Sequence, residues 1–173
     1  MIRLIEPCQD YLASYTEAFD EYEGFPRRAG NPFSDPREGD LLAHLDDMRH
    51  ARNLPDGWVG ATTLWLVDDE QQRFLGQIDI RHELTERLLQ YGGHIGYAIR
   101  LGEWNKGYGT LMLSLALPCA KELGITRCLI TCDDDNPGSA RVMEKNGFVL
   151  GDKVQNNIDG QTIITRRYWK ELN

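Results

Sequence analysis

A chain of 173 residues is long enough to bury one hydrophobic core, and we expect a single domain over residues 1–173. Its composition, 41% hydrophobic and 27% charged, is typical of a globular protein and excludes extended disorder. The net charge of −8 disfavours nucleic acid as a partner and weakly favours a cationic one. The sequence has no long apolar run and no signal peptide, so we expect no membrane partner and a cytoplasmic location.

The N-terminal third predicts one strand and two helices. Alternating residues 2–5 indicate a short strand, and apolar residues at helical spacing predict an amphipathic helix from about residue 9 to residue 23. A Gly-Phe-Pro sequence at residues 24–26 ends that helix, and the segment through residues 30–32 is expected to be a loop. A second, weaker helix is predicted over residues 35–53.

The middle of the chain predicts three strands. Residues 58–67 and 73–81 are rich in β-branched and aromatic side chains, and the polar turn at residues 68–72 between them indicates a hairpin. A third strand is expected at residues 94–100, and a glycine-rich loop follows it at residues 102–109.

The C-terminal third predicts two helices and three strands. Residues 110–123 are apolar almost all round, which indicates a buried helix that Pro118 kinks and Gly124 ends. The other predicted elements are a strand at residues 127–132, a helix at 137–146, and strands at 149–155 and 162–169 around a turn at 156–160. The whole order predicts an α/β or α+β fold, a mixed sheet with helices on both faces. Because such a fold serves many functions, the function has to be argued from a site.

Four cysteines are present, Cys8, Cys119, Cys128 and Cys132, and no two of them form a C-x-x-C pair. No His beside Cys128 or Cys132 suggests a metal ligand, so we expect no metal site. Buried structural thiols are the interpretation that we favour, with a catalytic thiol as the alternative.

Residues 95–110 combine a strand, a glycine-rich turn and the start of a helix. Gly107 and Gly109 allow backbone amides to approach a ligand, and the helix start presents unpaired N–H groups at the positive end of its dipole. Lys106 adds a full positive charge, so pyrophosphate is the expected guest. A Walker loop is excluded because the lysine precedes the glycines, and a dinucleotide turn because Met112 stands where its third glycine would be. The alternative is a helix start that binds nothing.

Four segments in this order resemble the GNAT superfamily of N-acetyltransferases, and the resemblance covers roughly residues 76–150. It implies a GNAT-like fold, with a mostly antiparallel central sheet and one splayed pair of strands. It also implies acetyl-CoA as the co-substrate. The segments are IGYAIR at residues 95–100, NKGYGT at 105–110, DNPGSA at 135–140 and EKNGF at 144–148.

The resemblance implies a role for each residue of these motifs. The pantetheine would lie between the strand that ends at Arg100 and the strand at residues 127–132. Arg100 and Arg141 are further candidates for phosphate contacts, although each is more often a surface or salt-bridge arginine. The implied cofactor-binding residues are Tyr97, Ala98 and Ile99 for backbone hydrogen bonds to the pantetheine, Lys106, Gly107, Tyr108, Gly109 and Thr110 for the pyrophosphate, and Asn136 and Ser139 for the pantetheine and adenosine side.

Two positions depart from the family pattern. Trp104 stands where the family has Arg or Gln, which removes one expected phosphate donor and leaves Lys106 as its substitute. Met143 stands where many members carry a tyrosine general acid. The loss of that acid is tolerable because a thiolate is a better leaving group than an alkoxide.

Amine acetylation needs a neutral nucleophile, and we consider three candidate catalytic residues that can help to form one. His94 opens the central strand where many relatives carry Glu, and its alternative role is a bond to backbone at a strand end. Asp79 points away from the face of its neighbours Ile78 and Ile80 and can receive a cationic acceptor, or it is a solvated charge on an outer face. Asp133 closes a strand beside the slot, or it only forms a turn.

The sequence therefore predicts an N-acetyltransferase that moves an acetyl group from acetyl-CoA to a primary amine of a small molecule or a protein. A homodimer is possible, and no metal is expected. One alternative is another acyl donor or an O-acceptor on the same fold. Another is an acyl-CoA-binding sensor without turnover, which Trp104 and Met143 suggest.

Overall fold

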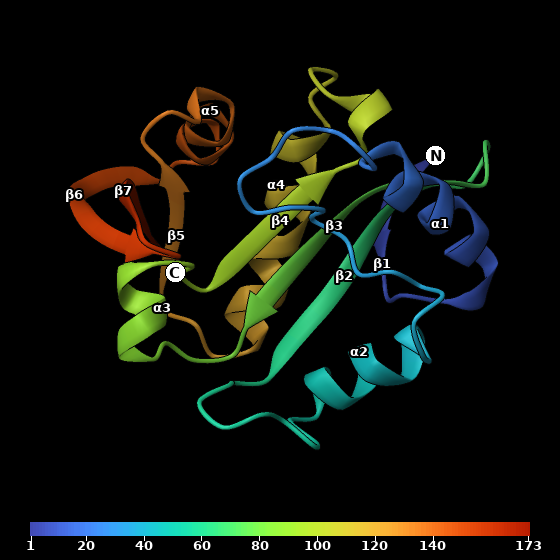
Figure 1. Ribbon diagram of the computed structural model, residues 1–173, viewed down its shortest axis with the longest axis horizontal. Coiled ribbons are helices and arrows are strands. Elements are labelled where there is room, and N and C mark those ends of the chain that lie inside the picture. Colours follow the sequence, from blue (N-terminus) through green and yellow to red (C-terminus); the bar gives the residue numbers. More distant parts are fainter.

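Seven β-strands form two sheets in the computed structural model, which describes residues 1–173 (Figure 1). The first sheet has the strand order β1-β2-β3-β4, and the second has the order β5-β7-β6. Every neighbouring pair within each sheet is antiparallel. The strands are β1 (Ile2–Ile5), β2 (Ala61–Asp68), β3 (Arg73–Arg81), β4 (Ile95–Ile99), β5 (Arg127–Asp133), β6 (Val149–Ile158) and β7 (Gln161–Glu171).

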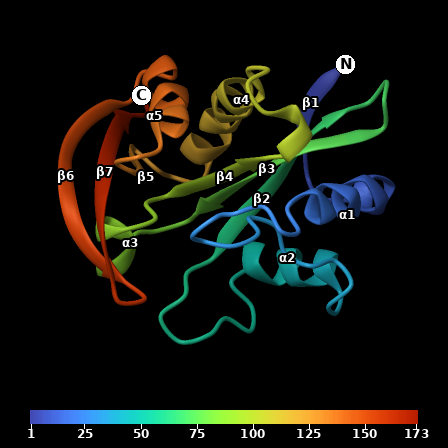
Figure 2. The ribbon, with the colours of Figure 1, turned by 45° about the horizontal axis from the view of Figure 1, so that its top comes forward.

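Helices cover both faces of the first sheet. Figure 2 shows α1 and α2 on one side of β1–β4 and α4 on the other, with α5 close to the second sheet. This arrangement confirms the predicted α/β (α+β) fold. None of the helices is long and apolar enough to cross a membrane. The helices are α1 (Leu12–Glu21), α2 (Leu41–Arg49), α3 (Glu86–Gln90), α4 (Tyr108–Glu122) and α5 (Pro137–Lys145), with short 3-10 turns at Gln9–Tyr11 and Leu101–Glu103.

The alternation of side chains along β3 divides the core in two. Ile78 and Ile80 are fully buried in the cluster that β3 shares with α4. A second cluster beneath α1 and α2 contains Trp65 of β2, whose indole N–H donates to Gln77 of β3 at 3.1 Å. Because side chains two residues apart on a strand share a face, Asp79 lies with Gln77 on the side of α1 and α2. Phe74 belongs to this cluster too, because the pairing of β3 with β2 shifts by one residue at Leu75.

β4 and β5 meet at one end and diverge at the other, which confirms the predicted splayed pair. Gly93 forms a single bridge to Ile130, and the N–H of His94 donates to the carbonyl of Leu129 at 2.8 Å. Beyond this point the two strands belong to different sheets. Gly93 has a φ of +65°, and a Cβ there would lie 2.5 Å from the Leu129 oxygen, so the close approach requires glycine.

The second helix is shorter than predicted. The sequence predicts residues 35–53, whereas α2 begins at Leu41. Asp40 is extended and caps the helix, because its Oδ1 accepts a hydrogen bond from the N–H of Ala43 at 3.0 Å. Helical spacing of a few leucines was therefore a weaker guide to the boundary than the cap residue.

Two further details differ from the prediction. The sequence analysis missed α3, a single turn in which the side chain of Thr85 accepts a hydrogen bond from a backbone N–H. The turn predicted at residues 156–160 is only two residues long, because Asp159 and Gly160 both have positive φ and form a tight hairpin. The ends of the other elements lie within three residues of the predicted ones.

Candidate functional site

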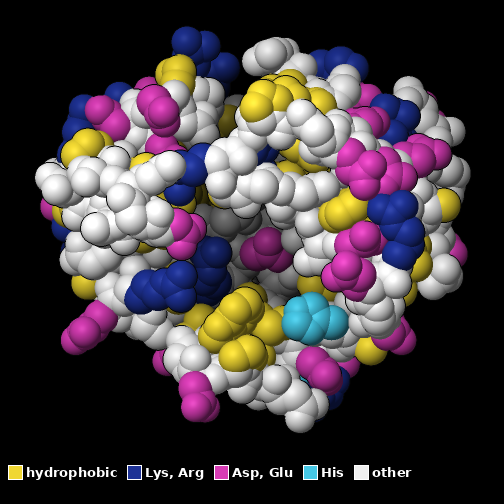
Figure 3. Space-filling model, viewed as in Figure 1, with side chains coloured by type: hydrophobic (Ala, Val, Ile, Leu, Met, Phe, Trp, Pro, Cys, Tyr) yellow, Lys and Arg dark blue, Asp and Glu magenta, His cyan; other side chains and the backbone are white.

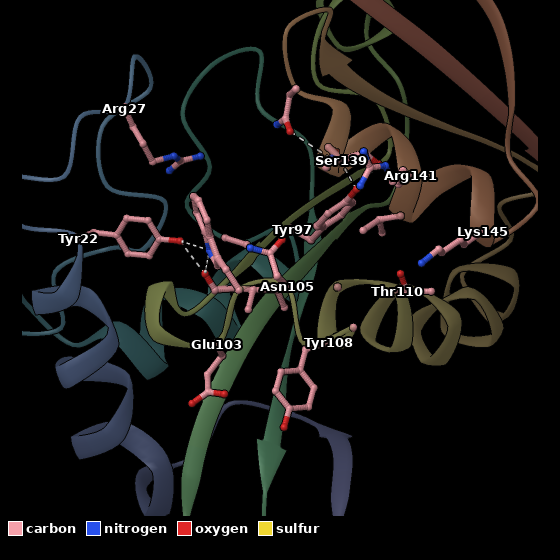
Figure 4. A pocket seen from close by; sticks show the side chains of 18 residues that line it. Tyr22, Arg27, Tyr97, Glu103, Asn105, Tyr108, Thr110, Ser139, Arg141 and Lys145 are labelled. Carbon is pink, nitrogen blue, oxygen red and sulfur yellow. Dashed lines mark hydrogen bonds between the residues drawn. The ribbon is translucent and has the colours of Figure 1, made fainter.

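A cavity of about 560 Å³ opens between the diverging strands on the side of α4 and α5 (Figure 4). We call it the first cavity. It brings together every residue predicted to bind the cofactor except Lys106. Its lining includes Tyr97, Ala98 and Ile99 of β4, Trp104, Asn105 and Gly107 of the following loop, Tyr108, Gly109 and Thr110 of α4, and Asn136, Ser139, Arg141 and Lys145 at α5.

The start of α4 presents free amides to the first cavity. Gly107 precedes the helix with a φ of +86°, and no side chain caps the helix. The first backbone N–H of α4 that bonds within this turn is that of Leu111, which donates to the carbonyl of Gly107. The N–H groups of Tyr108, Gly109 and Thr110 therefore have no partner in the protein. Together with the helix dipole they form an anion site.

Lys106 does not line this cavity. Its ammonium lies 2.8 Å from a carboxylate oxygen of Glu103, and Glu103 also accepts a hydrogen bond from Arg73 at 3.1 Å. Glu103 is buried, and these donors hold the pKa of its carboxyl below the usual value against the opposing effect of burial, which is the largest influence on it. The charge of Lys106 is thus neutralised next to the loop that was predicted to bind pyrophosphate.

Three other cations line the first cavity: Arg27, Arg141 and Lys145. None of them forms an ion pair within the protein, and Figure 4 shows Lys145 directed toward Thr110 at the start of α4. The sequence analysis considered Arg141 and set it aside, and it missed the other two. Arg100 is a salt-bridge arginine, the alternative to a phosphate contact, since it is buried and paired with two glutamates of α1.

Trp104 closes one wall of the first cavity. Its indole N–H donates to the hydroxyl of Tyr22 at 3.0 Å and to the carbonyl of Ile99 at 3.1 Å, and the Tyr22 hydroxyl donates to the same carbonyl at 2.6 Å. The Ile99 carbonyl is therefore already occupied. β4 is the edge of its sheet, so other backbone groups between Tyr97 and Ile99 are left free for a ligand.

Asn136 and Ser139 organise the start of α5. The side chain of Asn136 caps the helix by accepting a hydrogen bond from the N–H of Ser139 at 3.1 Å. The hydroxyl groups of Ser139 and Tyr97 are 2.7 Å apart, which links β4 to α5 across the cavity. A structural role thus accounts for part of the sequence pattern that suggested ligand contacts.

His94 lies where the two strands meet. Its Nδ1 accepts a hydrogen bond from the N–H of Leu129 at 3.0 Å, so in the neutral ring the proton is on Nε2. Burial and the charge of Arg81 both lower the pKa of His94. A proton can reach Nδ1 only by breaking the bond to Leu129, which makes this ring a donor rather than a base.

Asp133 is held by an ion pair at the open end of β5. Its carboxylate lies 2.5 Å from the guanidinium of Arg28, which also donates to the hydroxyl of Tyr91 at 3.1 Å. Arg28 belongs to the segment of residues 24–34 between α1 and α2, which we call the strap. The strap is therefore tied to the end of β5 and to the segment that precedes β4.

Asp79 lies in the middle of β3, recessed yet partly open to solvent. Its Oδ1 accepts a hydrogen bond from the hydroxyl of Thr63 at 2.5 Å, and the amide of Gln77 donates to both carboxylate oxygens at 3.2 and 3.4 Å. It has no ion-pair partner. Burial raises its pKa, although the two donors and the charge of Arg81 oppose that effect. Asp133 is separated from His94, since it lies four residues, or about 13 Å, along β5 from Leu129, the partner of His94.

A second cavity of about 800 Å³ lies on the other side of Trp104. It shares Arg27, Trp104 and Asn136 with the first cavity, so the two adjoin. The sequence analysis did not predict it, because its walls come from three distant segments. They are residues 25–29 of the strap, Asp133, Asp134 and Asp135 at the end of β5, and residues 161–164 at the start of β7.

The remaining candidates for chemistry are buried in the core. Met143 is fully buried, so its position presents no acid to the first cavity. Burial raises the pKa of Cys128 to about 12 and that of Cys132 to about 11, which favours structural thiols. No group of three or more His, Cys, Asp or Glu side chains is placed to hold a metal ion.

Solved structures with the same fold include acetyltransferases. An acetyltransferase of the GNAT family from Streptococcus pneumoniae is 17% identical with a TM-score of 0.67, covering 100% of this chain and 99% of that one. RimL, a ribosomal L7/L12 alpha-N-protein acetyltransferase in complex with CoA, is 15% identical with a TM-score of 0.72, covering 99% and 94%. The microcin C7 self-immunity acetyltransferase MccE, in complex with acetyl-CoA and AMP, is 17% identical with a TM-score of 0.72, covering 98% and 92%.

Comparison with curated protein sequences finds no match. The family described as acetyltransferase (GNAT) domain matches residues 6–149, which is most of the chain. This match includes the strands, the glycine-rich turn and the two helices that enclose the first cavity. The chain belongs to the GNAT acetyltransferase family.

Proposed function

We propose that this protein transfers the acetyl group of acetyl-CoA to a primary amine of a small molecule or a protein. The observation that carries the proposal is the row of free amides at Tyr108, Gly109 and Thr110, which face a cavity between two diverging strands. A diphosphate at these amides gains roughly 0.3–1 kcal/mol from the helix dipole, and about 2 kcal/mol where it is partly buried.

The donor would extend along the first cavity. Arg141 and Lys145 supply positive charge beside the free amides and are not neutralised by any carboxylate of the protein. The exposed edge of β4 offers backbone groups of Tyr97 and Ala98 to the pantetheine amides. In this assignment Lys106 holds the loop through Glu103 instead of contacting phosphate.

The acceptor would enter from the face of α1 and α2. A lysine-like amine has a pKa of about 10.4, so its neutral form at pH 7 costs about 4.6 kcal/mol, and a base has to offset part of this. Among the three candidates, His94 is bonded to backbone and Asp133 to Arg28. Asp79 is the candidate that has neither restraint and whose pKa is raised toward neutrality, so we assign the base to Asp79.

In the proposed reaction Asp79 first takes one proton from the ammonium, and the neutral amine nitrogen then attacks the thioester carbon. As the carbon–sulfur bond breaks, the second proton of the nitrogen passes to the leaving thiolate, and Asp79 returns its proton to solvent. The products are one amide and one thiol. The similar structures support an amine acceptor, since RimL acts on a protein α-amine.

The test measures thiol release from acetyl-CoA in the presence of a panel of primary amines and amino-terminal peptides. We expect at least one amine to accelerate release well above hydrolysis. Calorimetry with CoA provides the second readout. Absence of CoA binding at millimolar concentration would refute the proposal.

A second candidate function is a CoA-binding sensor without turnover. It is favoured by the buried Met143 at the position of the family's acid and by the Ile99 carbonyl, which Tyr22 and Trp104 already occupy. Tight CoA binding with no amine-dependent thiol release would select this alternative.

A further inference from the structure

We propose that Thr63 and Gln77 are positioning residues that orient the Asp79 carboxylate and leave its Oδ2 open to the acceptor amine. The inference rests on the proposed function and extends it to the residues that prepare the base. It follows from the hydrogen-bond geometry of one face of the first sheet.

The three side chains come from paired positions of two strands. Thr63 of β2 lies opposite Asp79 of β3, and Trp65 lies opposite Gln77. Cross-strand partners project from the same face of a sheet, and so do residues two apart on one strand. All four side chains therefore lie on the face of the sheet that carries α1 and α2. The register of the two strands brings these side chains together, so no motif in the sequence marks them.

The orientation of Gln77 is set by Trp65. The indole N–H of Trp65 donates to the Oε1 of Gln77 at 3.1 Å, so the amide nitrogen has to point toward Asp79. Trp65 is fully buried and stacks on Tyr15 at a centroid distance of 4.9 Å, with Phe74 at its edge. The aromatic cluster thus holds Trp65 in place, Trp65 orients the amide of Gln77, and that amide orients the carboxylate of Asp79.

The two oxygens of Asp79 are not equivalent. Oδ1 accepts the short bond from Thr63 together with a long one from Gln77, whereas Oδ2 accepts only one bond, from Gln77 at 3.2 Å. A carboxylate oxygen can accept at least two hydrogen bonds, so Oδ2 has free capacity. This is the oxygen that can take a proton from the amine.

The open side of Asp79 faces the neighbouring edge strand. Its partner on β4 is Gly96, which has no side chain to cover it. Figure 3, in the view of Figure 1, shows the surface hollowed near the middle of this face, over the strands. The guanidinium of Arg81 lies beside this position, with its Nη2 3.5 Å from where a Cβ of Gly96 would be, so it borders the space in which an amine would approach Asp79.

The charged surroundings do not neutralise Asp79. Arg81, two residues along β3, uses its guanidinium to donate to the carbonyls of Gly92 and Gly93 at 3.0 and 3.1 Å. Tyr15 of α1 is the other titratable group that senses the charge of Asp79, and burial keeps its pKa raised. An ammonium arriving from solvent would supply the missing counter-charge, and its proton would pass to Oδ2.

The experiment is the pH dependence of kcat/KM for an amine that the enzyme acetylates. Thr63→Val removes a donor to the ionised carboxylate, so the pKa of Asp79 should rise and the acidic limb should move to higher pH by about one unit. Gln77→Met should move it in the same direction. Thr63→Ser keeps the hydroxyl and should restore the limb to its wild-type position.

Thr62→Val is the matched control. Thr62 is the next residue of β2, is equally buried, and bonds to His82 on the opposite face at 2.8 Å, so its loss should leave the limb in place. The inference would be overturned if the acidic limb of the pH profile did not move in Thr63→Val, or if it moved as far in Thr62→Val as in Thr63→Val.

A second measurement separates this inference from the proposed function. The Cγ carbon of Asp79 can be titrated by NMR without any acceptor, and we expect a higher pKa in Thr63→Val than in the wild type. An unchanged pKa would overturn the positioning role. Absence of turnover with every amine would instead overturn the proposed function.

Discussion

The two faces of the split sheet bind in different ways. On the face of α4 and α5, the first cavity is built mostly from one stretch of chain, residues 97–145, with Tyr22 and Arg27 added from the N-terminal part, and it presents free backbone amides and unpaired cations. On the face of α1 and α2, the groups come from far apart in the sequence: Arg28 reaches Asp133 across 105 positions. Main-chain recognition needs only a local backbone shape, whereas side-chain recognition needs the whole fold.

The two faces also differ in how their charges are balanced. Arg141 and Lys145 in the first cavity lack partners, as expected where an anionic ligand supplies them. On the opposite face Arg28 and Asp133 are paired, whereas the recessed Asp79 has no ion-pair partner. This difference agrees with the proposed function, in which the first face binds the anionic donor and the second binds an amine that gives up a proton.

The largest expected effect comes from Asp79→Asn on the acceptor face. Loss of a general base lowers kcat/KM by about 10²–10⁴-fold, while the Kd for CoA should stay unchanged because the first cavity is intact. Steady-state kinetics measures kcat/KM, and calorimetry measures the Kd for CoA. Asp159→Asn in the β6–β7 turn is the control and should match the wild type. Equal losses of CoA binding and turnover in Asp79→Asn would contradict the separation of the two faces.

Gly107→Asp should weaken CoA binding on the order of 100-fold, through its strained φ and its charge beside the anion site. Gly124→Asp is a matched control: Gly124 has a φ of +87° against +86° for Gly107, and a Cβ at either position meets nothing within 4 Å. Both variants carry the same backbone strain, so the difference between their Kd values for CoA measures the effect of the substitution on the ligand site alone. Equal Kd values for the two variants would refute the binding of pyrophosphate at this turn.

The combined change Arg141→Ala and Lys145→Ala should weaken CoA binding about 10-fold at low salt and less at high salt, because screening reduces the lost attraction. Lys106→Ala should change the Kd by less than about 2-fold, since its charge already faces Glu103. Calorimetry at two salt concentrations measures both. A larger effect from Lys106→Ala would restore the role that the sequence motif suggested.

The smallest effect concerns His94 where the two faces meet. Its pKa is lowered in the folded state, so the unfolded chain binds the proton more readily and stability falls as the pH drops below about 6.5. His94→Asn keeps an acceptor for Leu129 but cannot be protonated there. Between pH 7 and pH 5.5 the wild type should lose about 2 °C more in Tm than this variant, measured by calorimetry. An identical loss would mean that His94 titrates normally.

Local patterns were sufficient to predict every strand, all helices except α3, and most of the residues that line the first cavity. The alternation in β3, the apolar α4 and the glycines before it depend on a few adjacent residues, and a helix start binds anions through its own backbone. The two-residue turn at Asp159 and Gly160 was also readable from its Asp-Gly pair, although the predicted turn was too long.

Only the tertiary structure decided which side chains have partners. The sequence predicts Lys106 as a phosphate ligand and His94 as a base, and it shows neither the pairing of Lys106 with Glu103 nor the bond from the N–H of Leu129 to Nδ1 of His94. The network of Thr63, Gln77 and Asp79 depends on the register of two strands, which a sequence does not display. The physical reason is that backbone groups are the same at every residue, whereas the protonation and charge of a side chain depend on neighbours that folding brings from elsewhere.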